Sequence, residues 1–109
     1  MAIRAAPTNR VFQALADPSR RAIFEALTRR ESAVKDLTER FEISQPAVSQ
    51  HLNTLKKAGL VRSRRDGRLV YYRVDARGMQ PLIDWLAHYQ AFWTESLGRL
   101  EQLLDRMDG

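Results

Sequence analysis

Apolar residues recur every three or four positions along most of this chain, which is the spacing of helices with one buried face. The pattern is interrupted once, where two β-prone runs follow each other closely. It predicts five helices and one hairpin, in the order residues 9–16, 18–30, 33–41, 45–58, a hairpin at 60–75, and 80–107. Residues 1–8 have little to bury and are predicted to form a loose arm.

Short polar residues mark the starts of three of these helices. Asp17 followed by Pro18 predicts an N-cap and a first helical residue. Ser32 and Ser44 are the predicted N-caps of the third and fourth helices. Only about three residues separate those two helices, so we expect a tight helix–turn–helix pair.

The fourth helix has two faces of different kinds. Val48, Leu52 and Leu55 form an apolar stripe. Gly59 then predicts a Schellman ending, in which Leu60 folds back onto Leu55. The opposite face has amides, hydroxyls and a lysine, with no carboxylate anywhere on the helix, and consists of Pro46, Ser49, Gln50, Asn53, Thr54 and Lys57. Amides and hydroxyls pair with base edges and acids would repel phosphate, although an ordinary solvated face has the same pattern.

The segment that follows, VRSRRDGRLVYYRVD, is strongly basic. Its two β-prone runs are joined by Asp66 and Gly67, a dipeptide that favours a type I′ hairpin turn. Residues 43–74 carry a net charge of +6, while the whole chain of 109 residues carries +5 and has a pI near 10.2. The positive charge is therefore concentrated beside the polar helix face. Such a cluster is the electrostatic footprint of nucleic-acid binding.

Two short helices joined by a tight turn and followed by a basic hairpin describe a winged helix-turn-helix. The predicted fold class is mainly α with a small β-hairpin wing, in the order four helices, two strands and a final helix. We expect one domain over residues 1–109, because a chain of this length forms a single modest core. Within it, residues 33–58 are the helix-turn-helix and residues 60–75 are the wing.

Three blocks occur in order and at a specific spacing: LADPSRRAIFEAL, SQPAVSQHLNTLKKAGLV and RRDGRLVYYRVD. On these blocks the sequence resembles the bacterial ArsR-type repressors over about residues 9–105. The resemblance implies a DNA-binding homodimer that represses its own or a neighbouring operon. It also implies that the first and last helices, 9–16 and 80–107, form the dimer interface.

The last predicted helix is about 40 Å long at 1.5 Å per residue, and its apolar residues advance by threes and fours, as in a helix–helix seam. A helix this apolar needs a partner surface, either the core of its own chain or a second copy. The residues predicted at a dimer interface are Val11, Phe12, Leu82, Trp85, Leu86, Tyr89, Trp93, Leu97 and Leu100.

The predicted DNA partner is a double-stranded, roughly palindromic operator, because a two-fold dimer presents two helices to major-groove segments about 34–36 Å apart. The candidate groove contacts are Gln45, Ser49, Gln50 and Asn53, of which the first three fall within the motif that reads DNA in relatives. The candidate phosphate contacts are Ser44, His51 and Lys56, with Arg64, Arg65 and Arg68 of the wing on the backbone or in a minor groove. For His51, a partly buried structural role is an equal alternative.

The chain has no cysteine, which excludes disulfides, thiolate metal sites and thiol redox sensing. The thiolate motif of ArsR-type metal sensors would fall on Ala33 and Lys35, and neither binds soft metals. Asp84 and His88 supply only part of the family's other common site, with no second histidine downstream. We therefore expect no metal and no cofactor. A small apolar effector among the aromatic residues of the last helix, or no effector at all, are both open.

An enzyme is not expected, because the sequence has no glycine-rich phosphate loop and no recognisable pair of acids. Ser49 and His51 are two apart on one helix and cannot face each other as nucleophile and base. The rival function is a winged-helix adaptor that binds proteins instead of DNA. An adaptor has no need of a +6 segment beside an acid-free helix face. No run approaches 18 consecutive apolar residues, so we expect no membrane segment and a cytoplasmic protein.

Overall fold

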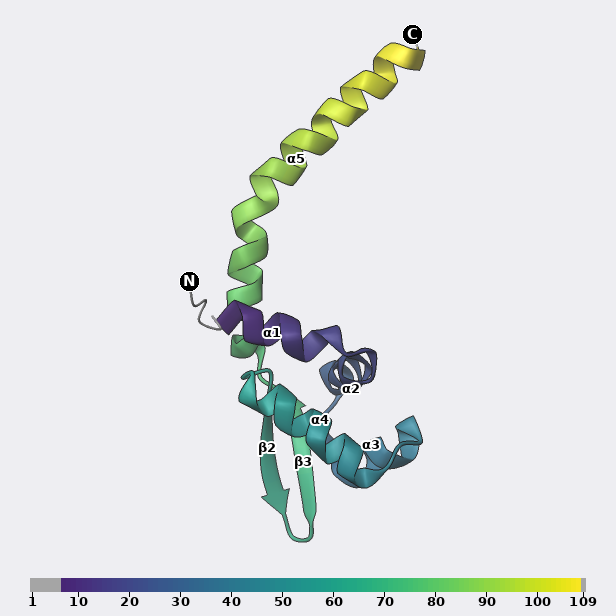
Figure 1. Cartoon of the computed structure of the whole chain (residues 1–109), viewed down its shortest axis with the longest axis vertical. Coiled ribbons are helices and arrows are strands. Elements are labelled where there is room, and N and C mark those ends of the chain that lie inside the picture. The colour runs from purple at the N-terminus through teal and green to yellow at the C-terminus, as the bar shows by residue number, and fades with distance from the viewer. Residues whose placement is uncertain (1–6, 109) are drawn as a thin grey trace, which may run out of the picture.

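The computed structural model describes residues 7–108 of the chain (Figure 1). The predicted fold class is confirmed, because a mainly helical chain carries a small antiparallel hairpin. The elements are α1 (Pro7–Ala16), α2 (Pro18–Arg29), β1 (Ser32–Ala33), α3 (Val34–Phe41), α4 (Gln45–Lys57), β2 (Val61–Asp66), β3 (Leu69–Val74), the 3-10 helix η1 (Ala76–Met79) and α5 (Gln80–Asp108). The predicted arm at residues 1–8 lies outside the described residues, except that Pro7 and Thr8 already belong to α1.

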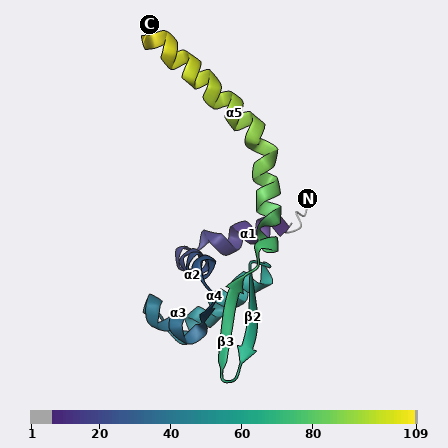
Figure 2. The same ribbon diagram turned by 180° about the vertical axis from the view of Figure 1, so that it is seen from behind.

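Helices α1 to α4 and the base of the hairpin enclose one apolar core, and α5 leaves this body as a single projecting helix (Figures 1 and 2). The largest side chains buried completely in that core are Val11, Ile23, Leu37, Val48, Leu52, Leu55 and Leu60. Burial of an aliphatic side chain of this size contributes about 1.5–3 kcal/mol to folding. The core is thus built from the apolar stripes of the first four helices, without a buried residue of α5.

Two of the three predicted helix caps are confirmed. Asp17 accepts a hydrogen bond from the amide of Arg20 at 2.9 Å, and this bond lowers the pKa of Asp17 below its ordinary value. Ser44 accepts from the amide of Ala47 at 3.3 Å and begins α4. In each case a proline occupies the first turn, where its missing N–H costs nothing.

The prediction that Ser32 caps the third helix is wrong. Ser32 lies in β1, where it pairs with Tyr72 of β3, and its hydroxyl bonds to the carbonyl oxygen of Arg30 at 3.3 Å. Helix α3 begins at Val34, and Ala33 precedes it with no side-chain cap. The sheet pairing extends the backbone at residues 32–33, so a tertiary contact overrides the local capping preference of serine.

The helix-turn-helix consists of α3 and α4. Glu42 ends α3 in the left-handed conformation, with φ of +53°. This conformation is disfavoured for residues other than glycine, but it turns the chain within three residues from one helix to the next. The predicted tight turn is therefore present, and it places α4 across the body with its N-terminus beside α3 (Figure 1).

The predicted Schellman ending of α4 is confirmed by its hydrogen bonds. The amide of Leu60 donates to the carbonyl of Leu55 at 3.0 Å, and that of Gly59 donates to Lys56 at 2.9 Å. Gly59 has φ of +81°, which a residue with a Cβ adopts only at a cost. The reversal buries Leu55 and Leu60 in the same core cluster.

The wing differs from the prediction in two respects. Its sheet has three strands in the order β1-β3-β2, all antiparallel, because Ser32 and Ala33 add a short strand that was not predicted. Asp66 pairs with Leu69, so the central turn residues are Gly67 and Arg68. Gly67 has φ of +62°, whereas Arg68 is not among the described residues with positive φ. That combination is typical of a type II′ turn, and the predicted type I′ turn is wrong.

We expect Gly78→Ala to destabilise the protein by about 1–3 kcal/mol, as overpacking of a tight site does. A Cβ at Gly78 would lie 1.8 Å from the carbonyl oxygen of Gly59, and backbone cannot move aside easily. The matched control is Gly98→Ala in the middle of α5, where a Cβ meets nothing within 4 Å. There alanine should stabilise the helix by up to about 1 kcal/mol. Urea unfolding at one fixed protein concentration measures both changes, and equal effects at the two positions would contradict this account.

Candidate nucleic-acid interface

The outward face of α4 is a solvent-exposed surface of amides and hydroxyls. Ser44, Gln45, Ser49, Gln50 and Asn53 are all exposed, and α4 has no acidic residue. The opposite face of the same helix is completely buried through Val48, Leu52 and Leu55. The core therefore fixes the rotation of α4 about its axis. Ser49, Gln50 and Asn53 come together on the free side, and Ser44 and Gln45 are exposed at the N-terminal end of the helix.

The register of the hairpin separates two neighbouring arginines of β2. Successive strand residues point to opposite faces, so Val61, Ser63 and Arg65 share one face. Val61 is buried against the core, and Ser63 accepts a 2.8 Å hydrogen bond from the Nζ of Lys56. Arg65 therefore projects from the face that α4 covers. Arg64 belongs to the opposite face.

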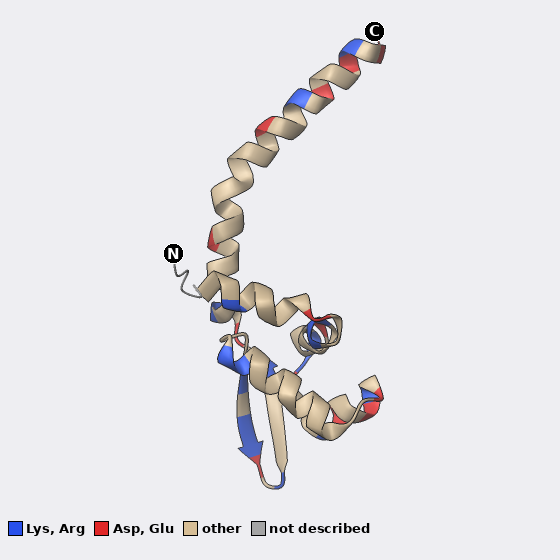
Figure 3. Cartoon of the chain, viewed as in Figure 1, with Lys and Arg blue, Asp and Glu red and all other residues tan. Residues whose placement is uncertain are grey.

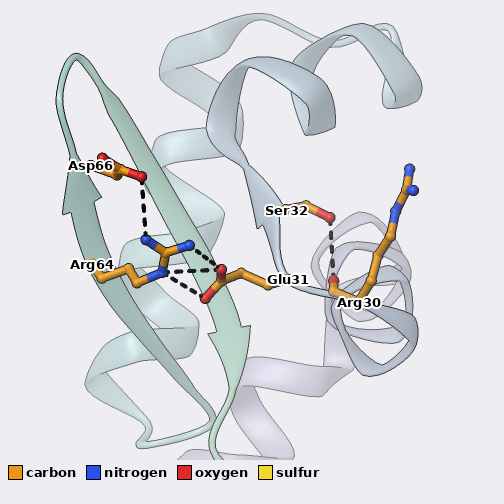
Figure 4. Close-up of polar contacts among 5 residues, drawn as sticks. All are labelled: Arg30, Glu31, Ser32, Arg64 and Asp66. Atoms are coloured by element: carbon orange, nitrogen blue, oxygen red, sulfur yellow. Dashed lines mark hydrogen bonds and ion pairs between the residues drawn. The ribbon is translucent and has the colours of Figure 1, made fainter.

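Arg64 is held by an ion pair on that opposite face (Figure 4). Its guanidinium lies over the ring of Tyr71 at 4.6 Å and donates to Glu31, with Nη2 at 2.6 Å and Nε at 3.1 Å from carboxylate oxygens. A third charge, Asp66, lies 3.8 Å from Nη1. The hydrogen bond from Arg64 lowers the pKa of Glu31 and raises that of Arg64. Arg64 is thus part of a clamp between β1 and β2, whereas the sequence placed it with the DNA contacts.

Arg65 and Arg68 are exposed and form no ion pair with any residue between 7 and 108. Figure 3 shows that Lys and Arg gather along β2 and at the C-terminal end of α4. Arg62, in contrast, pairs with Asp75 at 3.3 Å. Of the three wing arginines predicted to contact DNA, Arg65 and Arg68 are those that form no ion pair within the described residues.

His51 is half-buried at the edge of the apolar stripe of α4. Its Nδ1 is shielded from solvent and makes no hydrogen bond within the part of the chain that the structure describes. Only the other edge of the ring can therefore meet a ligand. The structure therefore gives His51 a packing position at the edge of the core, and its role as a phosphate contact stays a prediction.

The predicted dimer residues fall into two groups. Val11 is only 1% exposed and belongs to the core of its own chain, and Leu82 is half-buried against that core. The others are exposed large hydrophobics, and Phe12 of α1 meets Trp85 of α5 edge-on with ring centroids 5.2 Å apart. The exposed members are Phe12, Trp85, Leu86, Tyr89, Trp93, Leu97 and Leu100. Together they form an apolar strip along α5 that residues 7–108 leave uncovered.

Residues 7–108 contain no group of three or more histidine or acidic side chains placed to hold a metal ion. Asp84 accepts a hydrogen bond from Nε2 of Gln80 at 2.7 Å, and His88 packs edge-on against Tyr89. Within the same residues, no helix combines the length and apolar character that crossing a membrane requires.

Glu31 is the residue of this region that the sequence reading missed. Its role depends on β1, a two-residue strand with no periodicity to detect. The only signal in the sequence was an acid flanking a serine, which was read as a helix start.

The sequence was compared with known proteins. Residues 17–63 match the family described as "Bacterial regulatory protein, arsR family". The transcriptional repressor SdpR of Bacillus subtilis is 37% identical over 81 residues, which cover 74% of this chain and 90% of SdpR. The HTH-type transcriptional regulator Rv2034 of Mycobacterium tuberculosis is 43% identical over 97 residues, covering 89% of this chain and 88% of that protein.

The fold was compared with solved structures. The crystal structure of an ArsR family transcriptional regulator superposes with a TM-score of 0.74 at 31% sequence identity, covering 82% of this chain and 98% of that chain. A second, an ArsR-like transcriptional regulator from Rhodococcus sp. RHA1, has a TM-score of 0.71 at 31% identity and covers 89% of this chain and 92% of its own. The sequence match and the structural superpositions thus indicate the same family.

We expect Arg64→Ala to raise the pKa of Glu31 toward its ordinary value of 4.5, because the hydrogen bond that lowers it is lost. A lowered folded-state pKa means that the clamp stabilises the fold above about pH 4.5, and that this contribution is lost as pH falls through the folded pKa. An NMR titration of the Glu31 carboxyl carbon measures the change. Arg65→Ala, on the other face of β2, is the control and should leave the titration where it is.

Proposed function

The chain belongs to the ArsR family of bacterial regulatory proteins and is a DNA-binding transcriptional regulator, and from this we propose that it is a homodimeric repressor of its own or a neighbouring operon. In this proposal α4 enters the major groove of a roughly palindromic operator. The wing, at residues 60–75, contacts the DNA backbone or a minor groove. Helices α1 and α5 join two copies, and residues 33–58 form the helix-turn-helix of a single domain that spans residues 1–109.

One observation carries the DNA-binding role: the exposed face of α4 has no acidic residue, and Arg65 and Arg68 of the wing are exposed without an ion pair in residues 7–108. Carboxamides and hydroxyls pair with the edges of bases, and arginines neutralise phosphates. We assign Gln45, Ser49, Gln50 and Asn53 to the bases. The phosphate contacts are Ser44, His51, Lys56, Arg65 and Arg68, with Lys56 steadied by Ser63.

Arg64 differs from the other predicted phosphate contacts, because it already has a carboxylate partner. Its guanidinium faces away from α4 and is bound to Glu31, so a phosphate would have to displace a bidentate carboxylate. We propose that Arg64 orients the wing through Glu31 and contributes less to DNA affinity than Arg65. A charge-assisted pair of this geometry fixes orientation, even where exposure keeps its energy small.

The dimer is supported by the exposed apolar strip of α5. The large side chains of this strip are between 41% and 61% exposed in one copy. A soluble chain rarely leaves a continuous apolar surface of this extent uncovered. A second copy of the same helix, packed in a two-fold manner, would cover it and bring two α4 helices to one face. Half-sites about 34–36 Å apart would follow.

The first experiment is fluorescence anisotropy of a duplex from the upstream region of the gene, against an unrelated duplex of equal length, over a range of salt. Tight, salt-steep binding that favours the upstream duplex by about 10³ or more would support a sequence-specific repressor that acts on its own promoter. If both duplexes bind equally, selection from random sequences locates the operator. Absence of binding to any duplex at low salt would favour the adaptor function instead. A parallel series with zinc tests for a metal response.

Substitutions should separate the recognition of bases from the electrostatic attraction to phosphates. We expect Arg65→Ala to weaken binding to every sequence and to reduce the slope of log affinity against log salt by about 0.9, because one phosphate contact is lost. Gln50→Ala should instead lower the preference for operator over altered operator, with little change in slope. Arg64→Ala should change this slope less than Arg65→Ala does. Uniform loss of affinity in Gln50→Ala and Arg65→Ala alike would contradict this division.

The dimer is tested by one charge placed on either side of α5. Leu97→Asp should yield monomers in sedimentation velocity, because a carboxylate would be buried in the apolar strip. Ala91→Asp, exposed on the opposite side of the same helix, should leave the dimer intact. Both positions are exposed in one copy, so neither change threatens the core. Dimers that persist in Leu97→Asp would refute this interface.

A further inference from the structure

A cationic crevice lies between α1, α2 and the C-terminal end of α4, and none of the residues that line it is among the DNA contacts predicted from the sequence. Its volume is about 490 Å³. Three cations line it, namely Arg10, Arg20 and Lys57, with Gln13 and Thr54 as neutral polar neighbours. These residues come from three elements that are distant in sequence. Only the packing of α1 and α2 against α4 assembles them.

The crevice holds one arginine in a fixed position. The Nε of Arg20 donates to the carbonyl of Ala14 at 2.6 Å, and its Nη2 donates to the carbonyl of Gln13 at 3.2 Å. A guanidinium has five N–H donors, so about three remain for a ligand. The C-terminal carbonyls of α1 thus orient the guanidinium of Arg20 before any ligand arrives.

The described residues offset the positive charge of the crevice only in part, since Asp17 attracts Arg20 from the cap of α2. Within residues 7–108, no ion pair joins Arg10, Arg20 or Lys57 to a carboxylate. The carboxylate of Asp17 accepts from the amide of Arg20 and is engaged in capping α2. Helix α4 supplies no acid. Three cations around one cavity repel each other and favour an anion between them.

The crevice borders the outward face of α4. Lys57 lies seven residues after Gln50, which is two turns along the same face and about 10.5 Å further. Thr54 and Lys56 are two residues apart, at about 200° around the helix, so they lie on opposite flanks. Lys56 marks the wing flank by its hydrogen bond to Ser63, and Thr54 marks the crevice flank.

We propose that this crevice binds a phosphate oxyanion, supplied by the operator strand that borders the major groove on the side away from the wing. A helix inserted in a groove about 12 Å wide has a sugar–phosphate backbone along each flank. The wing then contacts one backbone, and the crevice contacts the other. The proposal rests on the function above in one respect, since α4 must enter the groove. The binding of an oxyanion in the crevice does not depend on DNA.

The test uses the full-length protein and two substitutions, Arg10→Ala and Lys57→Ala. Neither side chain makes a hydrogen bond or ion pair within the described residues, so the fold should persist. Arg21→Ala is the control, because it removes the same charge from α2 at a position outside the crevice. Unlike the two test residues, Arg21 donates a hydrogen bond, to the carbonyl of Leu15 at 2.9 Å, so any effect of the control on folding is the larger one. Each test variant should lower operator affinity about five- to tenfold at 0.1 M salt and reduce the salt slope by about 0.9.

A second arm omits DNA and measures thermal unfolding against inorganic phosphate at constant ionic strength. Loss of operator affinity in both test variants, but not in Arg21→Ala, supports the crevice with DNA as its source of phosphate. Unchanged DNA binding, together with a phosphate-dependent rise in Tm that the test variants lose, supports the same site with a free anion as its source. No effect in either arm, or an equal effect in Arg21→Ala, overturns the proposal. If the wild-type protein binds no operator, only the proposed function is refuted. The unfolding experiment with inorganic phosphate still tests whether the crevice binds an oxyanion.

Discussion

The structure depends on the reversal of the chain at Leu60. Its amide is bonded to Leu55 at the end of α4, and its carbonyl accepts from the amide of Asp75, which begins the connection to α5. Its side chain is completely buried in the core. One residue therefore ties the proposed recognition helix, the base of the wing and the start of the long helix into a rigid unit. The contact is so close that Gly78 has no room for a Cβ beside Gly59.

This unit explains how a modest core can support the exposed surface that we propose binds DNA. The apolar stripe of α4 is fully buried, so its polar face is fixed in direction without making bonds of its own. The bond from Lys56 to Ser63 and the clamp of Arg64 on Glu31 hold the wing from both sides of the sheet. Cations near the binding surface thus have two roles. Some are paired and set geometry, while others are unpaired and remain available to an anionic partner.

Helix α5 contributes little to this core. No residue of α5 is buried in the core, although Leu82 packs against it, and every residue from Ile83 to Asp108 except Ser96 and Gly98 is exposed in a single copy. One of its aromatic residues, Trp85, packs edge-on against Phe12 of α1. An extended apolar helix beside a finished core is favoured by burial against another surface, because the hydrophobic effect scales with the apolar area removed from water. This imbalance is what supports the proposed assembly of two copies.

The sequence by itself determined the helices, the buried stripe of α4, its capped start and its glycine ending, because each depends on residues within about four positions of one another. The family was also readable from the order of three local blocks. Only the tertiary structure decided that Ser32 lies in a strand, that Arg64 pairs with Glu31 while Arg65 does not, and that Val11 is core. It alone brought Arg10 and Arg20 to Lys57. These outcomes depend on strand register and on contacts between residues far apart in the chain, which local periodicity does not encode.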